Sequence, residues 1–169
     1  MPTADHVVTI RAATLDDVAV IHRMIVAIAD ATGAAGKVRS SVADLAEHGF
    51  GTQPAFTALL AEVDREPCGL SLFLPSFSTW RGRTGVYIQD FYVAPEARGQ
   101  GVADALLAAT AAHAATRGGT YVRLSVAAAN LRAQRFYARA GMAHSDDEHI
   151  YVLDGEAFAT AASRAAKAL

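Results

Sequence analysis

Residues 90–103 read DFYVAPEARGQGVA, and this stretch decides the fold. An apolar strand ending at Val93 is broken by Pro95, and a short loop then brings residues 98–101 (RGQG) to the head of an alanine-rich helix. The first N–H groups of a helix have no acceptor within it, and the helix dipole adds partial positive charge there. Glycines at positions 99 and 101 let the backbone approach an anion closely. The stretch therefore predicts a pyrophosphate cradle between a strand and a helix.

The composition is that of a globular protein and limits its partners. Of 169 residues, 52% are hydrophobic and 19% are charged, and 15 basic against 17 acidic residues give a net charge of −2. This balance argues against general nucleic-acid binding, which needs basic side chains to displace counterions. No apolar run reaches the length of a membrane span, and the N-terminus has no hydrophobic signal segment. We expect one domain over residues 1–169, located in the cytoplasm, with neither nucleic acid nor membrane as a partner.

Hydrophobic periodicity predicts alternating strands and helices. The expected strands are 7–10, 56–63, 69–74, 86–93, 121–126 and 150–153, with a polar loop over 78–85. The expected helices run from the N-cap Thr14 to about 31, from the N-cap Ser41 to 49, over 101–117, over 130–140 before Gly141, and from 156 onward. This order predicts an α/β (α+β) fold, in which helices flank a central mixed and mostly antiparallel sheet.

The strand at 86–93 has two faces that differ in chemistry. Plain alternation puts Tyr87, Gln89, Phe91 and Val93 on one face, and Ile88, Asp90 and Tyr92 on the other. Gln89 and Asp90 could then serve one site equally only if a bulge interrupted the strand.

A second informative stretch is residues 130–142, NLRAQRFYARAGM. On a helix, Ala133, Phe136, Tyr137 and Ala140 share a face that begins at Asn130. A small residue at Ala133 would let a ligand pass close to the helix. A phenol such as Tyr137 is a poor base at neutral pH but a usable proton donor to a leaving thiolate.

Together, RGQGVA (98–103) and NLRAQRFYARAG (130–141) resemble the two motifs of the GNAT superfamily of acyl-CoA-dependent N-acyltransferases, in the same order and spacing. The resemblance implies a GNAT-like fold that binds acetyl-CoA. The cofactor-binding residues that it implies are Phe91, Tyr92, Val93, Arg98, Gly99, Gln100, Gly101, Val102, Ala103, Asn130, Ala133, Phe136 and Tyr137.

Residues 78–93, STWRGRTGVYIQDFYV, are similar to the diamine (spermidine/spermine) N-acetyltransferase branch of that superfamily. This likeness implies a homodimer and a substrate site that includes Trp80, Tyr87, Gln89, Asp90 and Glu148. One departure matters, because Gln89 stands where the branch has a glutamate proposed to receive the amine's proton. An amide cannot act as that base.

The resulting prediction is an N-acetyltransferase that moves an acetyl group from acetyl-CoA to a primary amine, either a polyamine or a lysine-like small molecule, by direct attack. Tyr137 is the general acid, and a backbone N–H near Val93 is the oxyanion donor if the sheet opens there, as the resemblance implies. The proton acceptor stays open among Asp90, Glu148 and a water chain past Gln89. Cys68 lies in an apolar run and is expected in the core, which disfavours an acyl-enzyme.

Other interpretations accompany this prediction. The chain could be an acyl-CoA-binding sensor or inactive module, as the glutamine at 89 suggests, or an acetyltransferase for protein or peptide amines. Asn130 could only cap its helix, Tyr137 could be a core phenol, and Trp80 could pack against a second subunit instead of lining the substrate entrance. The six histidines have no ligand spacing, so no metal is predicted.

Overall fold

The computed structural model describes residues 7–146 and 148–165, which fall in two compact units, Met1–Gln134 and Arg135–Leu169. The strands are β1 (Val8–Ala12), β2 (Thr57–Val63), β3 (Glu66–Ser78), β4 (Arg83–Val93) and β5 (Val122–Leu124). The helices are α1 (Val18–Ala31), α2 (Val42–Phe50), α3 (Val102–Ala115), α4 (Leu131–Arg139) and α5 (Gly155–Ala165), with 3-10 turns η1 (Leu15–Asp17) and η2 (Pro95–Ala97).

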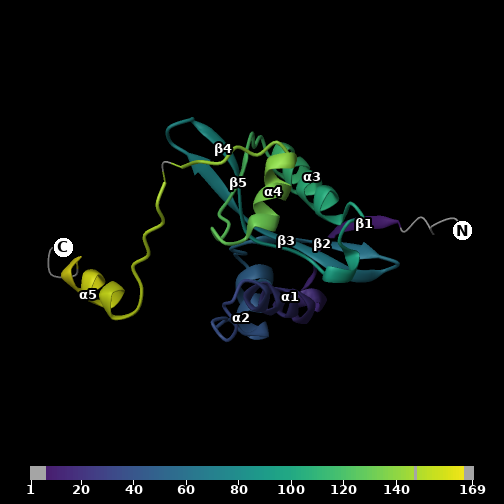
Figure 1. Cartoon of the computed structure of the whole chain (residues 1–169). Coiled ribbons are helices and arrows are strands. Elements are labelled where there is room, and N and C mark those ends of the chain that lie inside the picture. The colour runs from purple at the N-terminus through teal and green to yellow at the C-terminus, as the bar shows by residue number, and fades with distance from the viewer. Residues whose placement is uncertain (1–6, 147, 166–169) are drawn as a thin grey trace, which may run out of the picture. The chain divides into compact units, whose positions relative to one another are not determined.

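The first unit is built on one mixed sheet, as predicted. Its strand order is β1-β2-β3-β4-β5, and only the β4–β5 pair is parallel. Helices α1 and α2 cover one face of the sheet and α3 covers the other (Figure 1). In the part of the chain that the structure describes, no helix has the length and apolar character needed to cross a bilayer.

Each face of the sheet has its own apolar core. Leu60, Leu70 and Leu72 pack under α1 and α2, whereas Phe73 and Ile88 pack under α3. Helix α3 comes very close to β3, since a Cβ at Gly69 would stand 2.9 Å from the Leu106 side chain. Cys68 is buried in the α3-side core, and burial raises the pKa of its thiol, so the prediction of a core cysteine is confirmed.

The β3–β4 hairpin is longer than the sequence predicted. Strand β3 runs on to Ser78 and β4 begins at Arg83, so the stretch 78–85 that was expected to be a polar loop is a turn only at 79–82, and residues 78 and 83–85 belong to the ladder. Cross-strand hydrogen bonds hold these polar residues extended, because a two-stranded ladder requires backbone partners rather than apolar side chains. The hairpin reaches outward at the upper left of Figure 1.

A β-bulge at Gln89 changes the faces predicted for β4. Leu72 pairs with Asp90 but the next residue, Phe73, pairs with Ile88, so Gln89 is an extra residue without a partner on β3. Directly paired residues share a face of the sheet. Asp90 therefore lies on the α1/α2 side with Leu72 and Tyr87, and the prediction that grouped Asp90 with Ile88 is wrong. The reason is that a bulge resets the two-residue period.

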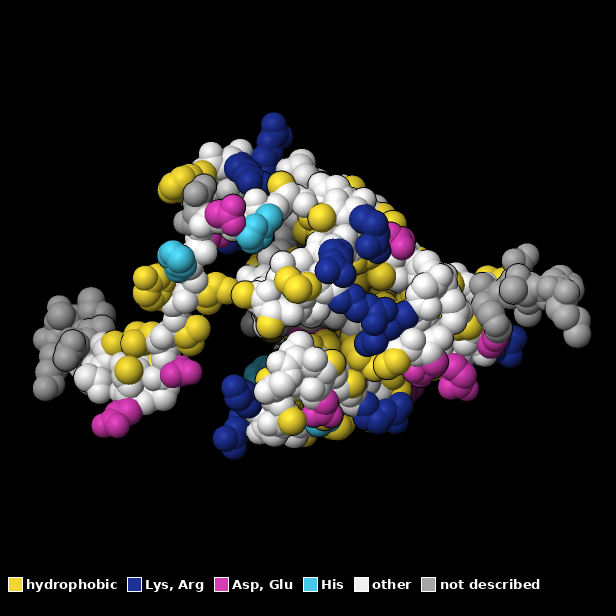
Figure 2. Space-filling view, in the orientation of Figure 1, with side chains coloured by type: hydrophobic (Ala, Val, Ile, Leu, Met, Phe, Trp, Pro, Cys, Tyr) yellow, Lys and Arg dark blue, Asp and Glu magenta, His cyan; other side chains and the backbone are white. Residues whose placement is uncertain are grey.

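The predicted strand at 150–153 is also absent. Residues 150–153 are extended but form no ladder within the described residues. Their large apolar side chains are exposed, at 73% for Ile150 and 91% for Tyr151, and Figure 2 shows hydrophobic side chains standing out along the segment that leads to α5. A β-prone sequence becomes a strand only when a neighbouring strand accepts its hydrogen bonds.

Strand β1 and the turn that follows it are joined by an ion network that the sequence did not reveal. Arg11 on β1 binds both carboxylate oxygens of Asp17, at 2.7 and 2.8 Å, and its Nε donates to Glu62 on β2 at 2.7 Å. The Arg11 guanidinium holds the pKa of the Asp17 carboxyl well below its usual range. The Thr14 N–H also donates to Asp17 at 2.7 Å, which confirms that the first helical turn begins at Thr14.

Candidate active site

Strands β4 and β5 separate where the site is expected. Their parallel pairing ends at Ile88 and Leu124, so beyond this point no described strand pairs with the outer edge of β4. The N–H of Ala94 donates to the Cys68 carbonyl on β3 at 2.8 Å. Because successive N–H groups of a strand point to opposite edges, the N–H of Val93 points to the edge that β5 has left. The opening of the sheet expected near Val93 is thus present.

The loop after β4 has the predicted cradle geometry. Gly99 and Gly101 have φ of 77° and 79°, and a Cβ added to either would meet no atom within 4 Å. Gly101 is the N-cap of α3 and provides no side-chain cap. The backbone N–H groups of residues 99–104 make no hydrogen bond within the described part of the chain. These N–H groups lie at the positive end of a helix dipole, and the two glycines leave open space beside them.

Two side chains hold this loop in shape. The Nε of Arg98 donates to the Val93 carbonyl at 3.1 Å, and Nε2 of Gln100 donates to the Glu96 carbonyl at 2.9 Å. Val102 is 1% exposed and anchors the first turn of α3 in the core, while Ala103 is half-buried beside it. A pyrophosphate fits this arrangement, since its oxygens need several converging N–H donors and no Cβ in their way.

Asp90 is the chemically distinctive residue of β4. It is partly buried on the α1/α2 side, and it has no hydrogen-bond or ion-pair partner within the described residues. Burial raises the pKa of its carboxyl. Phe91 and Val93 pack toward α3, and Tyr92 contacts both cores. An uncompensated carboxylate at this position favours a cationic guest.

The other predicted substrate residues are dispersed. The hydroxyl of Tyr87 donates to Ser125 Oγ at 3.0 Å, a contact that no sequence signal indicated. Gln89 is exposed at the bulge. Trp80 is 99% exposed in the turn of the β3–β4 hairpin. At the rise of a β-strand it lies roughly 20 Å from Asp90, so these two side chains do not meet within a single chain. Glu148 lies exposed in the second unit.

Helix α4 begins and ends as its motif predicts. The Asn130 Oδ1 accepts the Ala133 N–H at 3.1 Å, so Asn130 caps the helix. Gly141 follows the helix with φ of 84°, in agreement with its predicted C-terminal role. The rings of Phe136 and Tyr137 meet at 5.2 Å in an edge-to-face contact. Tyr137 belongs to the second unit, and burial raises the pKa of its phenol to about 12.

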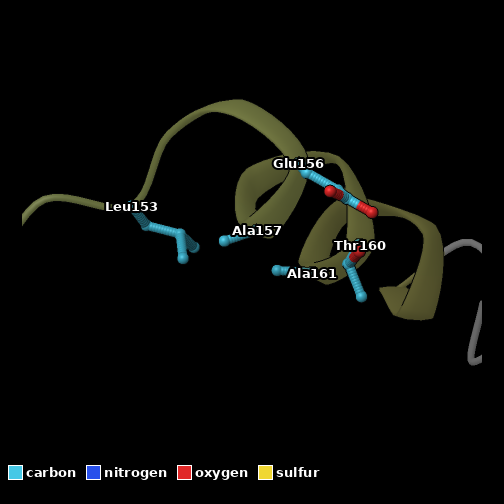
Figure 3. A pocket seen from close by; sticks show the side chains of 5 residues that line it. All are labelled: Leu153, Glu156, Ala157, Thr160 and Ala161. Atoms are coloured by element: carbon cyan, nitrogen blue, oxygen red, sulfur yellow. The ribbon is translucent and has the colours of Figure 1, made fainter.

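Two further features have no part in this chemistry. Among the described residues, no three His, Cys, Asp or Glu side chains are grouped so that they could hold a metal ion. A shallow hollow along α5 is lined by Leu153, Glu156, Ala157, Thr160 and Ala161 (Figure 3), whose side chains offer no nucleophile or base beyond one exposed carboxylate.

The sequence also matches known proteins over most of its length. The family model "Acetyltransferase (GNAT) family" matches residues 15–142. The thialysine N-epsilon-acetyltransferase of Bos taurus is 34% identical over 161 residues, which cover 89% of this chain and 94% of that protein. The mouse enzyme of the same name is 32% identical over 92% of this chain and 97% of its own length.

A solved structure of ribosomal-protein-alanine N-acetyltransferase from Brucella melitensis biovar Abortus 2308 shares the fold. Its TM-score is 0.68 at 23% identity, over 88% of this chain and 99% of that one. The family match, together with the cradle at 98–104 and the opened sheet beside it, therefore shows that this chain belongs to the GNAT family and is an N-acetyltransferase.

Proposed function

We propose that the enzyme acetylates the primary amine of a small cationic molecule, either lysine-like or a polyamine. The observation that carries this proposal is the partly buried Asp90 carboxylate, which has no cationic partner among the described residues. The thialysine N-epsilon-acetyltransferases that cover most of this chain support a lysine-like acceptor. The proposal treats residues 1–169 as one catalytic domain that acts in the cytoplasm.

Asp90 would hold the ammonium group and then accept its proton. An amine attacks only as the free base, so a carboxylate beside it both attracts the cation and removes the proton. Gln89, although adjacent in sequence, carries an amide that accepts no proton. The bulge places Asp90 on the α1/α2 side with Tyr87, and the partial burial of its carboxylate there favours Asp90 over a water chain past the exposed Gln89.

GNAT acetyltransferases use acetyl-CoA, which supplies the acetyl thioester. In this chain the N–H groups of 99–104 would bind its pyrophosphate, with Arg98 beside them. The Val93 N–H, turned to the edge that β5 has left, would donate to the carbonyl oxygen of the acetyl group as negative charge develops there. Direct attack without an acyl-enzyme is supported by Cys68, whose thiol is buried and has a raised pKa.

Tyr137 would present its proton to the departing sulfur. Burial raises the pKa of Tyr137 to about 12, so its hydroxyl stays protonated far above neutral pH. A free thiol has a pKa of roughly 8.5, so complete proton transfer from such a phenol is uphill. Most of the effect of Tyr137 would then be a strong O–H···S hydrogen bond to the developing thiolate.

Replacing Tyr137 with phenylalanine should lower kcat roughly 10- to 100-fold and change the KM for the amine little, because only a contact made as the sulfur departs is lost. Steady-state kinetics by thiol release measures both constants. Tyr121→Phe is the matched control, since it removes a hydroxyl that bonds Ser76 at 2.9 Å outside the site. A full kcat in Tyr137→Phe at every pH would exclude the role of general acid.

A panel of acceptors tests the substrate class directly. Thialysine, lysine, spermidine and putrescine should release thiol from acetyl-CoA with kcat/KM at least tenfold above lysine-containing and N-terminal peptides, because Asp90 suits a small cation that can reach a partly buried carboxylate. Release with peptides alone would contradict the proposal and indicate an acetyltransferase for protein amines. Calorimetric binding of acetyl-CoA with no turnover on any amine would instead indicate a sensor, as Gln89 suggests.

The proposal includes a homodimer. Trp80 is 99% exposed at a hairpin tip, and the apolar residues 150–153 are exposed as well. Residues 150–153 are four consecutive exposed apolar side chains of the second unit, and such a contiguous stretch marks an interaction site more often than an isolated side chain does. Trp80 would then meet a second copy of the chain, since it lies far along the hairpin from Asp90 of its own chain.

A further inference from the structure

The C-terminal end of α3 forms one wall of a second pocket, which we name the α3 C-terminal pocket. It has a volume of about 360 Å³ and lies between α3, the outer half of β3 and the start of β4. Its lining includes Phe73, Phe77 and Val86 from the sheet and His113 and Arg117 from the helix. A concave and mostly apolar space of this size with a few polar groups is the usual form of a small-molecule site.

This pocket is separate from the acetyl-transfer site. His113 follows Val102 at the cradle by eleven positions of α3, which is about 16 Å at the rise of an α-helix. Phe73 and Val86 belong to the α3 side of the sheet, whereas Asp90 lies on the α1/α2 side. We therefore expect neither the amine nor the pyrophosphate to bind in the α3 C-terminal pocket.

Two of the polar side chains that line the pocket already have partners elsewhere. The Thr84 hydroxyl donates to the Gly118 carbonyl at 3.1 Å, and Ser76 Oγ bonds the Tyr121 hydroxyl at 2.9 Å. No aspartate or glutamate lines the space. The polar side chains left for a ligand are those of Thr57, His113 and Arg117, and the last two can offer N–H donors.

His113 is held in an orientation that suits an acceptor atom. Its Nδ1 lies 3.4 Å from Nη1 of Arg117, and its ring meets Phe73 edge to face at 4.9 Å. Burial and the Arg117 charge lower the pKa of His113, which keeps the ring neutral at pH 7. Because Arg117 can only donate, Nδ1 accepts and the ring proton lies on Nε2, which has no partner among the described residues.

We propose that the α3 C-terminal pocket binds a small aromatic monocarboxylate. The ring would lie against the exposed side chains of Pro75 and Phe77, and the carboxylate would accept from Arg117 and from Nε2 of His113. The absence of any acid from the lining disfavours a cationic guest such as the amine substrate. This binding does not depend on the proposed acceptor or on acetyl transfer.

The test uses phenylacetate and its neutral counterpart 2-phenylacetamide as probes with the full-length protein. Chemical shifts of backbone amides should change on titration at Gly85, Val86, His113 and Gly119, with a Kd for phenylacetate of about 1 mM or below and roughly tenfold weaker binding of the amide. In Arg117→Gln, phenylacetate should lose about tenfold in affinity. Arg83→Gln removes an exposed arginine that does not line the pocket, and it should bind phenylacetate as the unchanged protein does.

Each other outcome overturns the proposal. Three such outcomes can be named. Chemical shifts at the pocket residues could fail to saturate at phenylacetate concentrations up to about ten times the expected Kd. Phenylacetate and 2-phenylacetamide could bind with equal affinity, or Arg83→Gln and Arg117→Gln could lose equal affinity for phenylacetate. Displacement of phenylacetate by saturating acetyl-CoA would assign the probe to the acetyl-transfer site instead. Because binding alone is measured, these results are independent of which amine is acetylated.

Discussion

Replacing Asp90 with asparagine should lower kcat/KM for the amine about 10²- to 10³-fold at neutral pH, as expected when a general base that also binds the ammonium group is removed. Asparagine keeps the size of the side chain but neither accepts the proton nor carries the charge. The measurement is initial-rate thiol release as a function of amine concentration and pH. In the unchanged enzyme, the rate should rise with pH as Asp90 loses its proton, and the asparagine variant should lack this rise.

The same substitution should leave folding intact, and this separates a catalytic role from a structural one. Burial raises the pKa of Asp90 in the folded state. The folded protein therefore binds the proton more tightly than the unfolded chain, so stability falls as pH rises from the unfolded pKa through the folded pKa. At neutral pH the ionised carboxylate is a net cost, and Asp90→Asn should have an equal or higher melting temperature. A kcat/KM within threefold of the original would exclude Asp90 as base.

Replacing Gly101 with valine should weaken acetyl-CoA binding by 100-fold or more. Gly101 has φ of 79°, and a β-branched residue there costs roughly 1–2 kcal/mol or forces the backbone out of the left-handed region. Either the N–H groups that follow Gly101 turn away from the cradle, or the new side chain enters the open space where phosphate oxygens would lie. Isothermal titration calorimetry with acetyl-CoA measures the change.

Gly118→Val is the matched control for this experiment. Gly118 has φ of 76°, and a Cβ there also meets no atom within 4 Å, but it follows the opposite end of α3. Both variants should lose a similar amount of thermal stability, and only Gly101→Val should lose acetyl-CoA affinity. Equal acetyl-CoA affinity in the two variants would show that residues 98–104 are not the pyrophosphate site.

Local sequence signals predicted the local geometry of this protein well. Thr14 and Ser41 precede their helices, Gly141 ends α4 in the left-handed region, and Gly101 begins α3 in the same conformation. Each of these depends on hydrogen bonds and dihedral angles within a few residues, so the neighbouring sequence specifies them. The cradle at 98–104 could be predicted for this reason, together with the family resemblance of its motif.

Features that depend on pairing between distant segments could not be predicted in this way. Residues 78 and 83–85 look like part of a loop but belong to the ladder, because each strand of the hairpin supplies the other's hydrogen bonds. Residues 150–153 look like a strand but have no ladder among the described residues. The ion network of Arg11, Asp17 and Glu62 likewise joins side chains up to 51 positions apart.

The sequence by itself determined the caps, the glycine-rich start of α3, the order of helices and strands and, through its motifs, the family. Only the tertiary structure decided on which face of the sheet the functional side chains of β4 lie. Gln89 is extruded because β3 pairs Leu72 with Asp90 and Phe73 with Ile88, and this register moves Asp90 to the α1/α2 side. Register is fixed by the packing of both sheet faces against separate helices, which no residue of β4 specifies alone.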